Sequence, residues 1–211
     1  MKLKYMLAVG AILFSCTTSA QTSAGIRAYN GPSLANGTYY PSYGGFRDSP
    51  REVVRSERGA AERGDASAQF KLALRYDVGQ GVPQDYAEAV KWLRRAADQD
   101  FVKAQYNLGC MYDSGQGVSQ DHAEAAKWFR KAAELGYASA QKNLGAKYGR
   151  GQGVPQSDVE AYVWSSIAAI SGDEGAMNNR DFAANKLSTD DLEAALKRAA
   201  EQYEEIQQRQ G

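Results

Sequence analysis

The chain has 211 residues, and its 25 Lys and Arg side chains are balanced by 25 Asp and Glu side chains, so its formal net charge at pH 7 is zero. This balance excludes the strongly basic character that draws proteins to nucleic acid. No stretch approaches the roughly 20 consecutive apolar residues that a transmembrane helix needs. The length is sufficient for one ordinary domain with tails.

The first 20 residues have the pattern of a secretory signal peptide. Met1 to Lys4 carries positive charge, Met6 to Phe14 is a short apolar run, and small residues then lead to Ala20. This succession is typical of a signal that is cleaved, here after Ala20. We therefore expect an exported protein, periplasmic or secreted. A buried first helix is the alternative interpretation.

Cys16 adds a second reading of the same segment. Leu13-Phe14-Ser15-Cys16 resembles a bacterial lipobox, in which the cysteine becomes a lipid-attachment site, although Phe14 stands where a small or β-branched residue is usual. A lipid anchor through Cys16, which would make an outer-membrane lipoprotein, and simple cleavage after Ala20 both remain open. In either case the mature chain has too few cysteines for the disulfide framework of a small secreted fold.

Residues 21–49 are rich in Gly, Ser, Asn and Tyr and show no helical or alternating apolar period, which predicts a flexible leader. The tyrosines of this leader could contact a partner or could simply be scattered in a linker. They are Tyr29, Tyr39, Tyr40 and Tyr43.

From about residue 65 the sequence repeats itself with a constant offset of 36 residues. The recurring residues are Ala68, Leu72 and Tyr76 with Ala104, Leu108 and Tyr112 and with Ala140, Leu144 and Tyr148; the loop Gly79-Gln-Gly-Val82 with 115–118 and 151–154; and Trp92 with Trp128 and Trp164. Such a period predicts a solenoid of three helix–turn–helix units, approximately residues 65–100, 101–136 and 137–172.

Each unit can be interpreted as two amphipathic helices. Ala68, Leu72 and Tyr76 lie four residues apart, as one stripe of a first helix that ends where Gly79 can adopt a left-handed C-cap. A capping box is expected where each second helix begins: Asp85 with Glu88, Asp121 with Glu124, and Ser157 with Glu160.

The ends of the repeat region depart from the pattern. Residues 50–64 fit the second helix without its Trp, which predicts a degenerate capping half-repeat before the repeats at 65–175. Past Ala176 the pattern fails, since Arg180 replaces the Leu and Ala184 the Tyr. A new amphipathic helix with Ser188 as its N-cap then predicts a helical cap over residues 176–211.

The recurring pattern Ala-x3-Leu-x3-Tyr-x2-Gly-x-Gly-Val-x2-Asp-x3-Ala-x2-Trp-x3-Ala-Ala resembles the Sel1-like repeat, a relative of the tetratricopeptide repeat. The resemblance implies an all-α fold, a right-handed α/α superhelical solenoid with helical caps, whose inner surface or edges bind a protein or peptide. For exported bacterial members it implies an adaptor in envelope signalling, polysaccharide export or host interaction. One cysteine-rich branch has been linked to binding or hydrolysing β-lactams and cell-wall fragments. That enzymatic role is the alternative, although the cysteine pair of each repeat in that branch is missing here.

Few residues could carry catalysis. His122, the only histidine, is placed beside a helix cap, which predicts a solvated turn residue and not a base or metal ligand. Cys110 aligns with the apolar Leu74 and Ala146, which predicts a small buried hydrophobe, with a reactive or bridged thiol as the alternative. We therefore expect no enzyme, no metal and no cofactor.

Positions that vary between the copies, while the frame stays fixed, are the natural candidates for recognising a partner. Those on the first helices are Phe70, Lys71, Arg75, Tyr106, Asn107, Met111, Lys142, Asn143 and Lys147. The apolar members could instead pack against the preceding helix, and both interpretations remain open. The basic members favour an acidic protein or peptide. The sequence indicates no nucleic-acid partner and leaves the oligomeric state open.

Overall fold

The computed structural model describes residues 50–210 of the chain. The predicted signal peptide at residues 1–20, the candidate lipidation site Cys16 and the predicted leader at residues 21–49 lie outside the described residues. The chain divides into two units, Met1–Arg47 and Asp48–Gly211, and the helices of the described residues all belong to the second unit.

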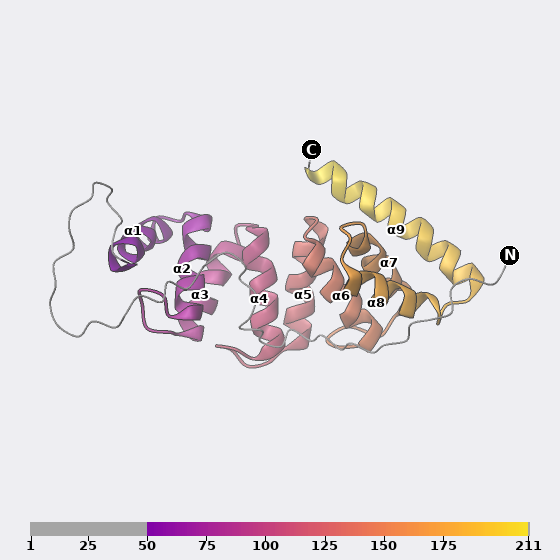
Figure 1. Cartoon of the computed structure of the whole chain (residues 1–211), viewed down its shortest axis with the longest axis horizontal. Coiled ribbons are helices and arrows are strands. Elements are labelled where there is room, and N and C mark those ends of the chain that lie inside the picture. Colours follow the sequence, from indigo (N-terminus) through magenta and orange to yellow (C-terminus); the bar gives the residue numbers. More distant parts are fainter. Residues whose placement is uncertain (1–49, 211) are drawn as a thin grey trace, which may run out of the picture. The chain divides into compact units, whose positions relative to one another are not determined.

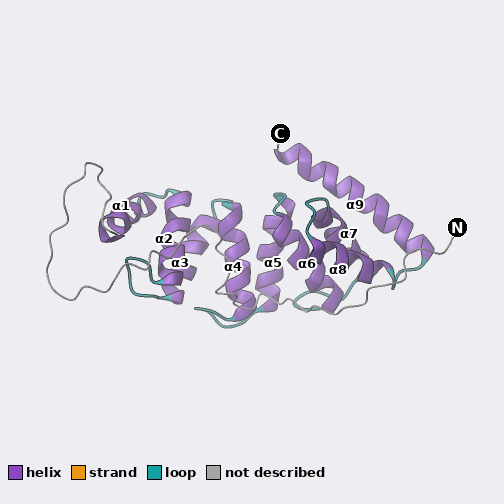
Figure 2. Cartoon of the chain, viewed as in Figure 1, coloured by secondary structure: helices purple, strands orange, loops and turns teal. Residues whose placement is uncertain are grey.

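The regular structure of the described residues is entirely helical, as Figure 2 shows. The nine helices of this region are α1 (Pro50–Glu62), α2 (Ala66–Val78), α3 (Tyr86–Ala97), α4 (Val102–Ser114), α5 (His122–Glu134), α6 (Ala138–Arg150), α7 (Asp158–Ala169), α8 (Glu174–Ala184) and α9 (Thr189–Gln210). The predicted all-α fold class is confirmed.

The helices pack in chain order, each against the next from α1 to α8 (Figure 1). We call α2, α4 and α6 the A-type helices and α3, α5 and α7 the B-type helices, since their bounds recur with the offset of the sequence repeat. By register, α1 is a B-type helix without its own first helix, and α8 is a fourth A-type helix. The three units therefore stand between two incomplete ones.

Local chemistry accounts for the ends of these helices. Gly79 ends α2 in a left-handed conformation with φ of 73°, and Gly115 and Gly151 repeat this at α4 and α6. At the start of α3, the Asp85 side chain accepts a hydrogen bond from the backbone N–H of Glu88, as predicted. The reciprocal half of the predicted capping box does not form. The N–H of Asp85 donates to the carbonyl of Tyr76 at 2.9 Å, and the Glu88 carboxylate pairs with Lys91 instead.

A buried glutamine ties each A-type helix to the unit before it. Its side-chain amide donates to a carbonyl in the last turn of the preceding B-type helix, including α1, at 3.0 to 3.2 Å. The three bonds are Gln69 to Ala61, Gln105 to Ala97 and Gln141 to Ala133. At the C-terminal end of the series, Met177 occupies this register in α8, so the tie is absent there.

A second tie repeats at the surface between units. The guanidinium of an arginine lies over the ring of a tyrosine 18 residues later and donates to its hydroxyl: Arg58 with Tyr76, Arg94 with Tyr112, and Arg130 with Tyr148. Sequence analysis assigned the tyrosines to a packing stripe and missed their partners. The recurrence of Arg58, Arg94 and Arg130 with the repeat period was the available signal.

The last helix packs away from its neighbour in sequence. α9 packs on α7, and the Arg198 guanidinium pairs with the Glu160 carboxylate. Farther along α9, the side-chain amide of Gln210 donates to the Leu135 carbonyl at 2.8 Å, at the turn between α5 and α6. α8 consequently buries only two of its side chains, those of Ala176 and Ala183.

Candidate functional site

The outward sides of the A-type helices and α8 carry side chains in rows that follow the repeat. Residues three, four and seven apart on a helix share one side, so four positions of each helix form this surface. We call it the A face: Ser67, Lys71, Leu74 and Val78 on α2; Lys103, Asn107, Cys110 and Ser114 on α4; Ser139, Asn143, Ala146 and Arg150 on α6; and Gly175, Asn179, Phe182 and Lys186 at α8.

The central row of the A face is apolar and open to solvent. Leu74 is 37% exposed on α2 and Phe182 is 63% exposed on α8, while Cys110 and Ala146 between them are half-buried. The prediction that Cys110 is buried is wrong, because its register lies opposite the stripe that packs against the B-type helices. Exposed apolar side chains that align along neighbouring helices are typical of an interaction surface.

A second row of the A face is rich in amides. It runs from Lys71 through Asn107 and Asn143 to Asn179. The Asn107 amide donates to the Lys103 carbonyl at 2.7 Å, which leaves its oxygen turned to other donors. Asn179 extends the row onto α8, and sequence analysis missed it because the repeat pattern fails at the next residue.

The variable positions 70, 106 and 142 link neighbouring A-type helices. Each contacts the N-cap residue of the next one, 31 residues later in sequence. Phe70 stacks on Phe101 with 5.2 Å between ring centroids, Tyr106 stacks on Tyr137 at 5.0 Å, and the Lys142 ammonium lies 2.7 Å from the Asp173 carboxylate. The structure thus places these three side chains in packing contacts, and a partner-binding role for them stays a prediction.

The variable positions 75, 111 and 147 face the preceding unit. Arg75 pairs with Glu57 of α1, whose hydrogen bond raises the pKa of the guanidinium. Met111 is buried, and the Lys147 ammonium pairs with Asp113 of α4. Three of the four basic residues predicted to attract a partner, namely Arg75, Lys142 and Lys147, therefore already have carboxylate partners, whereas Lys71 is exposed on the A face.

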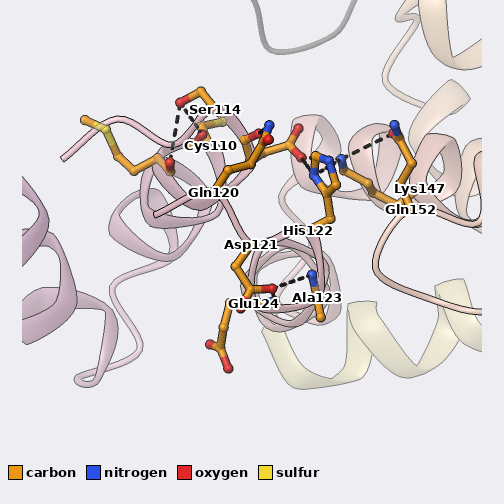
Figure 3. Close-up of polar contacts among 11 residues, drawn as sticks. Cys110, Ser114, Gln120, Asp121, His122, Ala123, Glu124, Lys147 and Gln152 are labelled. Carbon is orange, nitrogen blue, oxygen red and sulfur yellow. Dashed lines mark hydrogen bonds and ion pairs between the residues drawn. The ribbon is translucent and has the colours of Figure 1, made fainter. Parts of the chain in front are cut away.

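His122 belongs to the same junction: it lies beside the helix cap as predicted, but its side chain is only partly exposed to solvent. It is the first residue of α5, and its Nδ1 lies 2.7 Å from Oδ1 of Asp113 and 3.4 Å from Nζ of Lys147. Figure 3 shows His122, Lys147 and Gln152 turned toward one another, with Cys110 and Ser114 on a separate part of α4. Since Lys147 is only 7% exposed, the cluster joins α4, α5 and α6 as an internal ion pair.

The described residues contain no group of three or more His, Cys, Asp or Glu side chains that could hold a metal ion. Within the same range, no helix combines the length and apolar character needed to cross a bilayer.

Three tandem helix–turn–helix units, packed in chain order and joined by recurring side-chain contacts, define a helical-repeat scaffold protein. The model of the Sel1 repeat matches residues 66–101, 102–137 and 138–173, about half of the chain. The chain belongs to the Sel1 repeat family.

Solved structures agree with this assignment. A Sel1 repeat protein from Oxalobacter formigenes is 39% identical, with 62% of this chain and 98% of that chain covered and a TM-score of 0.57. The protein c5321, a protective antigen present in uropathogenic Escherichia coli strains, is 28% identical, with 76% of this chain covered and a TM-score of 0.57. This chain spans only 42% of that protein. The comparison with curated proteins finds no match.

Proposed function

We propose that this protein is a non-catalytic adaptor of the bacterial cell envelope that binds a polypeptide on its A face. Signalling, polysaccharide export and host interaction are the processes in which such an adaptor would act. The observation that carries the proposal is the central row of the A face, where Leu74 and Phe182 leave apolar surface exposed to water.

The ties between units support a binding role because they hold the A face in one arrangement. Buried glutamine bonds, arginine–tyrosine contacts and the junction around Asp113 fix each A-type helix to its neighbours. A surface that is already ordered loses little conformational freedom when a partner binds, so more of the contact energy appears as affinity.

The N-terminal sequence supports the envelope as the location. Residues 1–20 carry the pattern of an export signal, and Cys16 is a candidate lipid-attachment site. Mass spectrometry of the mature N-terminus separates the alternatives: Gln21 as the first residue means simple cleavage, a lipid-modified Cys16 means a lipoprotein, and a retained Met1 contradicts export.

Site-specific crosslinking in cells tests the binding surface. We would place a photoreactive phenylalanine derivative at position 146 in the centre of the A face and, in a matched control, at position 196 of α9, where Leu196 is 50% exposed. We expect a discrete crosslinked polypeptide from position 146 only. When Leu74→Glu is added to the protein with the photoreactive residue at position 146, the crosslinked product should disappear. Adding Leu196→Glu to the same protein should leave the product unchanged. Crosslinking that is equal at both positions, or that survives Leu74→Glu, contradicts the proposal.

Incubation with a chromogenic β-lactam and with muropeptides tests the non-catalytic part of the proposal. We expect no turnover above buffer. Turnover that a single point substitution abolishes would show that the protein is an enzyme.

A further inference from the structure

The exposed charges of the A face all have one sign. On α2, α4 and α6 this surface carries three basic side chains, Lys71, Lys103 and Arg150, and no acidic one. All three are exposed, and none forms an ion pair with another described residue. Since the whole chain has no net charge, this local excess does not reflect a general surplus of basic residues.

Four carboxylates near these helices have other partners. Asp65 accepts the N–H of Ala68 at the start of α2, and Asp100 accepts from the side-chain amide of Gln105 before α4. On the B-type helices, Glu88 and Glu124 pair with lysines three residues later. These four carboxylates therefore do not pair with the basic side chains of the A face, which are left for a partner to neutralise.

From this charge pattern we infer that the segment bound on the A face is an extended acidic peptide that also carries apolar side chains. The inference rests on the proposed function, because it presupposes that the A face is the binding surface. The bound carboxylates pair with Lys71, Lys103 and Arg150, and the apolar side chains cover Leu74 and its neighbours in the central row.

The amide row favours an extended segment over a helix. A helix satisfies its backbone N–H and C=O groups internally, so a helical peptide would have few backbone groups left to form hydrogen bonds with a row of asparagines. An extended chain presents these groups along its length, and each Asn side chain can both donate and accept.

A single-stranded nucleic acid is also acidic, but it binds proteins by stacking its bases on exposed aromatic rings. Phe70 and Tyr106 already stack on Phe101 and Tyr137, which leaves Phe182, with the Lys186 ammonium 4.5 Å from its ring centre, as the single aromatic residue among the A-face positions. The chemistry of the A face therefore favours a peptide.

The test begins with selection of phage-displayed random 12-residue peptides on the immobilised protein. Selected peptides are then synthesised with a fluorescent label and their affinity is measured by anisotropy. We expect enrichment of Asp and Glu together with Leu, Ile, Val or Phe. An exposed ion pair contributes a factor of roughly 1.5 to 5 in affinity, so the variant K71Q/K103Q/R150Q should bind roughly 3- to 100-fold more weakly.

The matched control is R55Q/R63Q/R209Q, which removes the same charge from three exposed arginines outside the A face that form no ion pair with another described residue. It should change the affinity by less than about twofold, since these residues lie outside the A face. Thermal unfolding of both variants checks that they remain folded.

The outcomes separate the inference from the proposed function. If Leu74→Glu abolishes binding but the selected peptides are neutral or basic, or the control variant loses as much affinity as K71Q/K103Q/R150Q, the acidic-peptide inference is overturned while the A face stands. Displacement of the peptide by a 12-residue oligothymidylate at equal concentration also overturns it. If no selected peptide is sensitive to Leu74→Glu, the proposed function fails as well.

Discussion

Replacing Gly117 by alanine tests whether the second glycine of each loop sets the stacking of the units. Gly117 has a φ of +70°, and its α-carbon lies directly against the backbone of the preceding unit. A Cβ built there would overlap the carbonyl of Tyr86 and would lie 2.9 Å from the N of Ala87. Both atoms belong to the first turn of α3, so no side-chain rotation can relieve the overlap.

The expected cost has two parts. Holding alanine in the left-handed region costs about 1–2 kcal/mol. Forcing extra volume between two packed backbones costs about another 1–3 kcal/mol. The substitution Gly117→Ala should therefore lower the free energy of unfolding by about 2–5 kcal/mol, and Tm by roughly 2–4 °C for each kcal/mol in a protein of this size.

Gly172 provides the matched control, since it has a φ of +81° and a Cβ there would meet nothing within 4 Å. Gly172→Ala should carry only the conformational cost of about 1–2 kcal/mol. Thermal and urea unfolding of the two variants, followed by circular dichroism, gives the difference between them. If Gly117→Ala proves no more destabilising than Gly172→Ala, the loop does not hold the units in register as the structure suggests.

Three further predictions concern buried or paired polar groups. Gln141→Met should cost only about 1 kcal/mol in urea unfolding, because the Gly136 N–H still donates to the carbonyl that Gln141 contacts, and a loss above about 3 kcal/mol would contradict this. Burial raises the pKa of Asp77, so its carboxylate destabilises the fold at pH 7. Asp77→Asn should therefore raise Tm at pH 7, and this gain in Tm should shrink as the pH falls through the raised pKa. A lower Tm of Asp77→Asn at pH 7 would contradict this prediction. Burial alone would raise the pKa of Asp173, but the hydrogen bond and charge of Lys142, together with two backbone N–H groups, lower that pKa. The Asp173 carboxylate therefore stabilises the fold above its usual pKa, and this contribution is lost as the pH falls through the lowered pKa. Asp173→Asn should lower Tm slightly at pH 7 and not at pH 2, and equal losses of Tm at both pH values would refute the assignment.

The repeat period was sufficient to predict most of the backbone. Gly79 ends α2 as expected, because only glycine adopts the required conformation without strain. The Arg58–Tyr76 contact was not predicted: Arg58 recurs with the repeat period, but the identity of its partner follows only from the packing of consecutive units. The packing of α9 on α7 could not be predicted from the sequence either. The apolar stripe of α9 predicts burial, and Ala195, Ala199 and Ile206 are buried, but no pattern in the sequence indicates that α7 is the helix on which it packs.

The candidate site shows why variation between repeats is an incomplete guide to binding. Positions 70, 106 and 142 differ in every unit, yet their partners at 101, 137 and 173 change with them, from aromatic pairs to an ion pair. A position that varies together with its contact is repacked, and its variation says nothing about a partner outside the chain.

The A face differs in this respect. The residues Leu74, Cys110, Ala146 and Phe182 also change from unit to unit, but they point away from the side of each helix that packs on the B-type helices. Their variation therefore has no compensating change in the side chains that hold the units together. Substitutions at exposed surface positions usually change the free energy of unfolding by less than about 0.5 kcal/mol. These four residues are accordingly the positions at which substitution should change binding and leave Tm nearly unchanged, which Leu74→Glu is designed to show.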